Sequence, residues 1–392
     1  MSDRLSRIEE RLRQVDDALV CLSQRLERLE RGSARSGDLA FAAPAPHPAL
    51  RAPRSDAVSL LSLTGRTCLV FGGAYLLRAL TESGQVPVTA GVLLGLLYAV
   101  GWLAAAERAG STSALFHGLA TVLIGLPIVW EAAARFGFLS PAQSGLALAA
   151  IVALSFVVAW HRRLAALAAV IAVATLAASM ALVVSLDRVV PFAALLVGSA
   201  GAALWIAYHR DWTWLAVLTG LTSVSAVLAA LMRALAVPPR DPAGTVLALQ
   251  IALVAIYFVS FAVRALLRSP LGIYEYVQGA LVLVAGLGGA IALTRGHDLA
   301  VMSIGGVTLV GAVLAYGIAF GAIRRQNAQA ATLHFFTSLG LVLSLMGGRL
   351  LLADAPYAVV LSAGALAAVG LGRWMASPVL TLHGALALFV AA

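Results

Sequence analysis

From about residue 57 onward, apolar stretches alternate with short breaks that carry charges. A helix needs about 20 consecutive apolar residues to cross the ~30 Å hydrocarbon core of a bilayer, and most of these stretches are that long. Only 11% of the 392 residues are charged, whereas an ordinary soluble domain carries about 25%. A soluble fold of this size would lack the charges to cover its surface. The pattern predicts an all-α, polytopic transmembrane helix bundle in residues 57–392.

The apolar stretches predict about thirteen helices arranged as repeated hairpins. Helices that run in the same direction end repeatedly with an aromatic residue followed by arginine, as in Trp160-His161-Arg162, and such repetition is typical of growth by duplication. The expected helices are 58–80, 86–106, 112–133, 144–160, 164–186, 191–208, 212–235, 244–264, 275–295, 299–322, 333–353, 356–372 and 378–392.

The first 31 residues follow a heptad pattern, with arginines beside the apolar seam that face acids on a parallel, in-register partner. This pattern predicts a cytoplasmic coiled-coil helix that forms a homo-oligomer, with a dimer favoured. The alternative is a lone amphipathic helix lying on the membrane or on its own core. Residues 32–56, rich in Pro and Ala, predict a disordered linker. The apolar seam consists of Leu5, Ile8, Leu12, Val15, Leu19, Leu22, Leu26 and Leu29.

Every one of the 27 basic residues is arginine, and the formal net charge is +9. The absence of lysine in a chain rich in Ala, Arg, Gly and Leu is typical of a GC-rich bacterial genome. The excess arginines lie between apolar segments, which fits the positive-inside rule and argues against nucleic-acid binding. Their distribution predicts a protein of the bacterial cytoplasmic (inner) membrane with its N-terminus in the cytoplasm.

Motifs that identify an enzyme do not occur in the sequence. It contains neither a phosphate-binding glycine loop nor a His-Glu-x-x-His motif, and its two cysteines, Cys21 and Cys68, form no CxxC pair. We therefore predict no catalytic residue, no cofactor and no metal, and expect that the protein is not an enzyme.

Ionisable residues inside apolar segments are the main functional lead, because charge in hydrocarbon is unfavourable. Arg78, Glu131 and Arg349 lie near the ends of three helices that share one membrane face in the expected topology. If those helices converge, the three side chains would line a polar pocket suited to an anion or a lipid head group. The alternative is that each reaches the interface or pairs locally, as Arg78 could with Glu82 and Arg349 with Asp354.

Histidines recur at similar depths in three helices, at His117, His334 and His383. They could relay protons or bind a metal, but packing against neighbouring helices is the commoner role of such residues. Glu275, between Tyr274 and Tyr276, is expected at the inner face in contact with water.

The opening of the apolar region resembles a known family. The coiled coil and linker are followed by Gly65-Arg66, Gly72-Gly73 and the run from Tyr75 to Ala79, and this order resembles the large bacterial "predicted membrane proteins" that share a domain of unknown function. The resemblance implies an N-terminal coiled coil followed by a long array of transmembrane helices, but no activity. Members are usually longer, so we expect a short or truncated representative.

Three functions fit these features. The first is a structural or scaffolding protein of the inner membrane, whose partners are the lipid bilayer, other copies of the chain and a cytoplasmic or envelope protein. The second is a transporter or lipid-handling protein for an anionic substrate, with Arg78, Glu131 and Arg349 as its site. The third is a membrane enzyme acting on a lipid or envelope precursor, with His117 or Glu131 as its base.

Overall fold

The computed structural model describes residues 54–267, 271–294, 298–323, 330–374 and 377–391. The predicted coiled coil of residues 1–31 and most of the predicted linker lie outside the described residues. The chain divides into two units, Met1–Arg66 and Thr67–Ala392, and everything described below about packing concerns the second unit.

The described residues form thirteen helical segments and no strand, which confirms the all-α fold. Each segment corresponds to one of the predicted ranges. Three of them contain a π-helical turn: Glu131–Arg135 extends α4, Leu283–Gly288 joins α10 to α11, and Gly317–Ile323 extends α12. The helices are α2 (Arg54–Glu82), α3 (Val88–Arg108), α4 (Ser111–Trp130), α5 (Pro141–His161), α6 (Ala165–Leu186), α7 (Val190–Arg210), α8 (Thr213–Ala234), α9 (Ala243–Leu266), α10 (Ile273–Val282), α11 (Gly289–Thr294), α12 (Asp298–Tyr316), α13 (Ala330–Leu351), α14 (Asp354–Trp374) and α15 (Pro378–Ala391).

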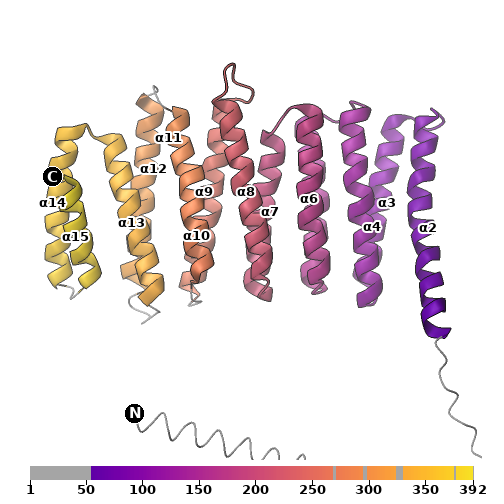
Figure 1. The fold of residues 1–392 in the computed structure, drawn as a ribbon, viewed down its shortest axis with the longest axis horizontal. Coiled ribbons are helices and arrows are strands. Elements are labelled where there is room, and N and C mark those ends of the chain that lie inside the picture. Colours follow the sequence, from indigo (N-terminus) through magenta and orange to yellow (C-terminus); the bar gives the residue numbers. More distant parts are fainter. Residues whose placement is uncertain (1–53, 268–270, 295–297, 324–329, 375–376, 392) are drawn as a thin grey trace, which may run out of the picture. The chain divides into compact units, whose positions relative to one another are not determined.

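Successive helices run in opposite directions and follow one another in chain order (Figure 1). Neighbours such as α3 and α4, α7 and α8, α12 and α13, and α14 and α15 pack as hairpins, while α7 also packs against α5 and α9. Glycines permit some of these contacts. A Cβ at Gly384 in α15 would lie only 2.7 Å from the backbone carbonyl oxygen of Ala365 in α14. Small residues at helix contacts are typical of helix packing in membranes.

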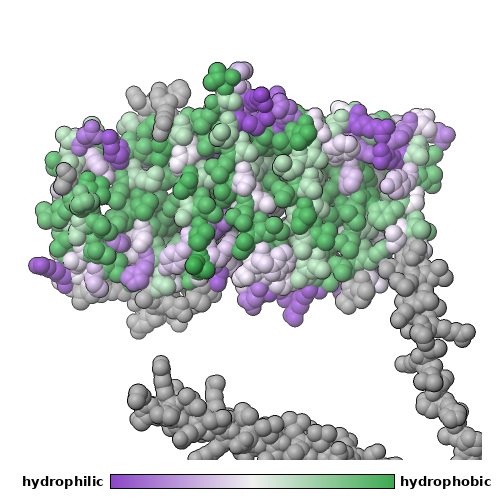
Figure 2. Space-filling view, in the orientation of Figure 1, coloured by the Kyte–Doolittle hydropathy of each residue, from purple (hydrophilic) through white to green (hydrophobic). Residues whose placement is uncertain are grey.

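Eleven helices among the described residues are long and apolar enough to cross a membrane. Their outward side chains are apolar as well; Val184 and Val313, for example, are 79% and 71% exposed. Figure 2 shows an apolar band across the middle of the helices, with hydrophilic residues gathered where the helices end. Side chains of this kind are stable against lipid chains rather than water, so the band has the chemistry of a surface that faces a bilayer.

Capping residues and turns mark where helices begin and end beside the apolar band. Ser140 caps α5, because its side chain accepts a hydrogen bond from the Gln143 backbone and the Gln143 side chain accepts one from the Ser140 backbone. Asp187 and Asp211 follow α6 and α7 in the left-handed conformation, with φ of 50° and 57°. These ends place charged residues beside the apolar band.

Candidate functional sites in the membrane domain

Two of the three predicted site residues meet. Arg78 Nη1 in α2 lies 2.9 Å from Glu131 Oε1 at the end of α4, and Arg78 Nε donates to Glu82 Oε1 at 2.8 Å. Arg135 donates to the same Glu82 oxygen. The cavity beside them measures about 40 Å³, far below the ~300 Å³ of a typical small-molecule pocket. The arrangement is a four-charge network whose charges balance one another.

Arg349, the third predicted residue, lies apart from this network. It pairs with Asp354 at 2.6 Å, and the two side chains are 58% and 87% exposed. Its helix α13 packs against α12, α14 and α15 rather than α2 or α4. The structure therefore does not bring Arg349 to Arg78 and Glu131. Arg349 instead pairs locally with Asp354.

The three histidines do not share one site. His117 in α4 stacks on Trp102, with ring centroids 5.0 Å apart. His383 in α15 is buried, and its Nδ1 lies 3.2 Å from the hydroxyl of Tyr316 in α12. In the part of the chain that the structure describes, no group of three His, Cys, Asp or Glu residues is placed to hold a metal ion.

Glu275 is buried, so the expectation of a carboxylate in contact with water is wrong. Its side chain is 3% exposed and forms an ion pair with Arg264 of α9, whose side chain is 20% exposed. The other carboxylate oxygen accepts a hydrogen bond from the backbone N–H of Gly272 at 2.7 Å. Glu275 sits at the third position of α10, where a carboxylate reaches back to the helix start, and this bond turns it inward.

The Arg264–Glu275 pair is the centre of a polar cluster built by four helices. The Arg264 guanidinium lies 4.5 Å from the ring centroid of Tyr208 in α7, a cation–π contact. The Tyr274 hydroxyl, from α10, donates to the backbone carbonyl of Ala216 in α8 at 3.0 Å. Ionisable residues inside membrane helices are rare and often mark functional sites.

A groove of about 530 Å³ opens beside this cluster, between α7 and α9. Its polar lining comes from the last turns of the two helices, which lie at one membrane face. The rest of its lining is apolar and comes from the preceding turns. The polar residues are Tyr208, His209, Ser260 and Arg264, and the apolar ones include Gly201, Trp205, Ile256 and Val259.

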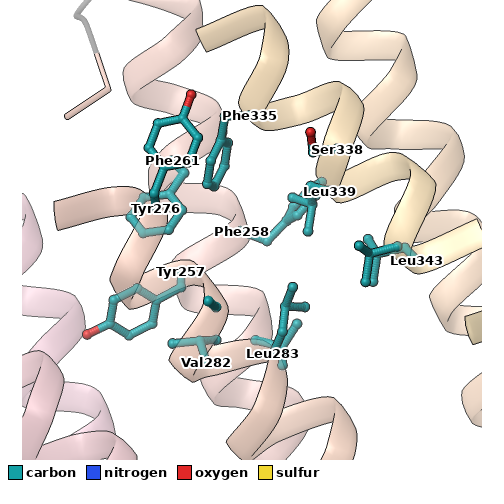
Figure 3. Close-up of a pocket in the computed structure, with 14 residues that line it drawn as sticks. Tyr257, Phe258, Phe261, Tyr276, Val282, Leu283, Phe335, Ser338, Leu339 and Leu343 are labelled. Carbon is teal, nitrogen blue, oxygen red and sulfur yellow. The ribbon is translucent and has the colours of Figure 1, made fainter. Parts of the chain in front are cut away.

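A second cavity, of about 190 Å³, lies on the other side of α9, against α10 and α13. Figure 3 shows aromatic side chains around it, among them Phe261, Tyr276 and Phe335. The ring of Tyr257 lines the cavity, while its hydroxyl points away from the leucines on the opposite side. The cavity is almost wholly apolar, so it offers no partner for that hydroxyl.

Arg264 and Tyr208 were not predicted from the sequence as site residues. The available signal was weak, because an aromatic residue followed by arginine recurs at several helix ends. Arg264 differs from the other described arginines at those helix ends because it pairs with Glu275 at the start of the next helix. Only the packing of α9 against α10 brings these two side chains into contact.

In comparisons with known proteins, no family model matched this chain, and no match was found among curated proteins or solved structures. The class therefore follows from the architecture. The eleven membrane-length apolar helices found in the described ranges, together with the apolar outer band, define a multi-pass membrane protein in contact with the lipid bilayer.

Proposed function

We propose that this protein is a lipid-handling protein of the bacterial inner membrane, which binds an anionic amphiphile in the groove between α7 and α9. The observation that carries the proposal is the division of the groove lining into an apolar part and a polar end. An acyl chain fits against Gly201, Ile256 and Val259, and a phosphate or carboxylate head group fits at Arg264 and His209.

The polar end has hydrogen-bond donors to offer. Glu275 occupies Nη1 of Arg264, and a guanidinium carries five N–H donors in a planar fork suited to phosphate. His209 is exposed, and its Nδ1 lies 2.9 Å from the Trp205 carbonyl oxygen. That bond leaves the other ring nitrogen, Nε2, for contact with a head group in the groove that His209 lines.

This proposal keeps the class of anionic substrate expected from the sequence but moves the site. Arg78 lies beside a cavity of only about 40 Å³ and is paired with two carboxylates, whereas Arg264 is paired with one and lines the groove of about 530 Å³. The scaffolding role, with oligomers formed through residues 1–31, rests on a coiled coil outside the described residues. Because the groove lies within the described residues, we favour lipid handling over the scaffolding role.

The proposal includes the orientation expected from arginine placement. With the N-terminus in the cytoplasm, the ends of α7 and α9 that carry Arg264 and His209 lie at the cytoplasmic face. The head group would then come from the inner leaflet, where an anionic lipid is in contact with cytoplasmic water.

Retention of lipid through purification tests the proposal. The full chain is incorporated into vesicles that contain phosphatidylglycerol and phosphatidylcholine with identical acyl chains, extracted in mild detergent and analysed by native mass spectrometry. The variant Val259→Trp fills the groove from its lipid-exposed side, where a larger side chain does not disturb the core. Val184→Trp adds the same bulk to an exposed site on α6, outside the groove.

We expect the unmodified protein and Val184→Trp to retain phosphatidylglycerol in preference to phosphatidylcholine. Val259→Trp and His209→Ala should each lower phosphatidylglycerol retention about tenfold, equivalent to ~1.4 kcal/mol. Equal retention by Val259→Trp and Val184→Trp, or equal retention of the two lipids by the unmodified protein, would overturn the proposal.

A further inference from the structure

A series of buried polar side chains extends through the packed helices α8, α9 and α10–α11. On α9, three of its members are spaced seven residues apart, at Gln250, Tyr257 and Arg264. Seven residues make nearly two full turns, so the three lie on one face of α9 at intervals of ~10 Å. Asp241, just before α9 begins, is also buried and marks the opposite end of the series.

Gln250 is the most isolated member. It has no exposed surface, and neither atom of its amide group has a hydrogen-bond partner among the residues that the structure describes. Gly289 of α11 lies directly beside it, and a Cβ at that position would overlap the Gln250 amide nitrogen. An amide buried without partners is unfavourable by roughly 1–3 kcal/mol in proteins. The fold nevertheless keeps this space for a polar side chain.

Tyr257 and Gln278 repeat the arrangement nearer the other face. Both are buried, and the Tyr257 hydroxyl and the Gln278 amide nitrogen each lie 2.9 Å from where a Cβ of Gly220 would be. Neither atom has a partner with full hydrogen-bond geometry within the described part of the chain, although the Tyr257 hydroxyl lies beside the polar side chains of Ser223, Tyr274 and Gln278. The nearby Ser223 hydroxyl donates to the Gly220 carbonyl at 2.9 Å. Two polar groups thus meet at a glycine with hydrogen-bonding capacity to spare.

Each end of the series holds a carboxylate paired with an arginine. At one end, Asp241 accepts a hydrogen bond from Arg233 at 2.7 Å, and Arg233 also contacts Asp187 at 2.8 Å. At the other end, Glu275 is paired with Arg264. Both carboxylates are nearly completely buried, with side chains 2% and 3% exposed.

A π-helical turn lies next to the middle of the series. Residues Leu283–Gly288 join α10 to α11, and a Cβ at Gly286 would lie 3.2 Å from the Gln250 backbone carbonyl oxygen. Such turns interrupt regular helix packing and occur frequently at functional sites. The glycines in and beside this turn bring its backbone close to α9, next to the Gln250 side chain.

We propose that this series is a hydrated proton pathway across the membrane. Each ~10 Å interval along α9 is spanned by about three water molecules at hydrogen-bond spacing, with Gln250, Gln278 and Tyr257 as their protein partners. This inference goes beyond lipid binding and does not depend on it.

The carboxyl groups of Glu275 and Asp241 exchange protons with water at the two ends. A proton adds to one carboxylate, and O–H bonds form and break in turn along the water chain and the Tyr257 hydroxyl. The last water of the chain protonates the other carboxylate, which then releases that proton to the opposite side, so that one proton enters and one leaves. The charged and titratable groups that face Glu275 are Arg264, Tyr208 and Tyr274; those near Asp241 are Arg233, Asp187 and Arg240.

Proton flux in vesicles tests the proposal directly. The full chain is reconstituted into phosphatidylcholine vesicles that contain a pH-sensitive dye, and a potassium gradient with valinomycin drives protons inward. Gln250→Leu and Gln278→Leu remove two polar partners at similar volume. Tyr257→Phe removes only the hydroxyl and so keeps the packing. Ser155→Ala is the matched control, because Ser155 of α5 is also buried and without a partner in the described region, but lies outside the series.

We expect flux at least about tenfold above that of protein-free vesicles for the unmodified chain and for Ser155→Ala. Tyr257→Phe and both leucine variants should fall to the protein-free level. Flux of the unmodified chain at the protein-free level would overturn the pathway, and so would full flux in Tyr257→Phe together with the leucine variants. Phosphatidylglycerol retention is a separate readout, so the failure of one proposal is distinguishable from the failure of the other.

Discussion

Removal of Glu275, an acid in a buried ion pair, should destabilise the protein more than removal of Asp354, an acid in an exposed pair. Glu275→Leu leaves the Arg264 guanidinium beside the apolar groove without its carboxylate. Breaking one side of a fully buried ion pair costs about 3–5 kcal/mol, because the remaining charge stays desolvated. Arg264 keeps 20% of its side chain exposed and retains its contact with the Tyr208 ring. These two features lower the expected loss of unfolding free energy to about 2–3 kcal/mol.

The double variant Arg264→Leu/Glu275→Leu gives the sharper test. Replacing both members of a buried pair with apolar residues is often neutral or stabilising, because neither charge has to be desolvated. We therefore expect the double variant to lose less unfolding free energy than Glu275→Leu alone. The coupling energy of the double-mutant cycle should be about 2 kcal/mol.

Reversible unfolding in mixed micelles, followed by tryptophan fluorescence, measures these differences, since the chain has seven tryptophans. The matched comparison is Asp354→Leu, which removes an acid from an exposed pair. If the two single variants of the buried pair add up to the effect of the double variant, the two side chains are not coupled, and the reasoning about Arg264 and Glu275 is refuted.

Three further predictions concern helix contacts and exposed charges. Gly384→Ala should destabilise the protein by about 1–3 kcal/mol in the same unfolding assay, because the added methyl group meets backbone atoms of α14. The control is Gly370→Ala, whose Cβ would have no atom within 4 Å; it should be neutral or stabilising by up to about 1 kcal/mol. The hydrogen bond from Arg233 holds the pKa of the Asp187 carboxyl below its usual value. Asp187→Asn should therefore lower the thermal midpoint above about pH 4, and its difference from the unmodified chain should disappear as the pH falls further and the carboxylate is protonated. A difference that does not depend on pH would contradict this cause. Arg349→Ala should change the unfolding free energy by less than about 0.5 kcal/mol, because its ion pair is exposed, and a larger loss would show that Arg349 has a role beyond this pair.

The helices were predictable because a single physical requirement determines them. Each helix must hydrogen-bond its own backbone polar groups across ~30 Å of hydrocarbon, and the length of each apolar run matches that thickness. The range 164–186, for example, corresponds to Ala165–Leu186 in the structure. The π-helical turns were not predictable, because they depend on how a neighbouring helix packs and leave no periodic signal in the sequence.

The site was harder to predict because sequence indicates the depth of a residue but not its lateral position. Arg78, Glu131 and Arg349 lie at similar helix ends, and only the order of the helices separates the third from the first two. Depth alone also misplaced Glu275, because its hydrogen bond to Gly272 depends on the local path of the chain before α10.

The polar series on α9 could have been found from its spacing. The sequence shows polar side chains seven residues apart on one face of an apolar helix, at Gln250, Tyr257 and Arg264. Their burial was not predictable, since an isolated α9 could present that face to any of its neighbours. Only the packing against α8 and α10–α11 closes the face.

The polar side chains of Gln250 and Gln278 are not what stability alone favours in a buried helix contact. At Gln278 the amide nitrogen alone lacks a partner among the described residues. A core selected only for stability would place leucine at Gln250, because an unsatisfied buried amide costs about 1–3 kcal/mol. It would also have little reason to place glycine where an alanine Cβ would meet each amide, as Gly289 and Gly220 do. Helix propensity disfavours glycine by a further ~1 kcal/mol at each of these positions. Buried polar side chains face glycines in two separate helix contacts, between α9 and α11 at Gln250 and between α10 and α8 at Gln278, and water is the simplest partner for the atoms that lack one.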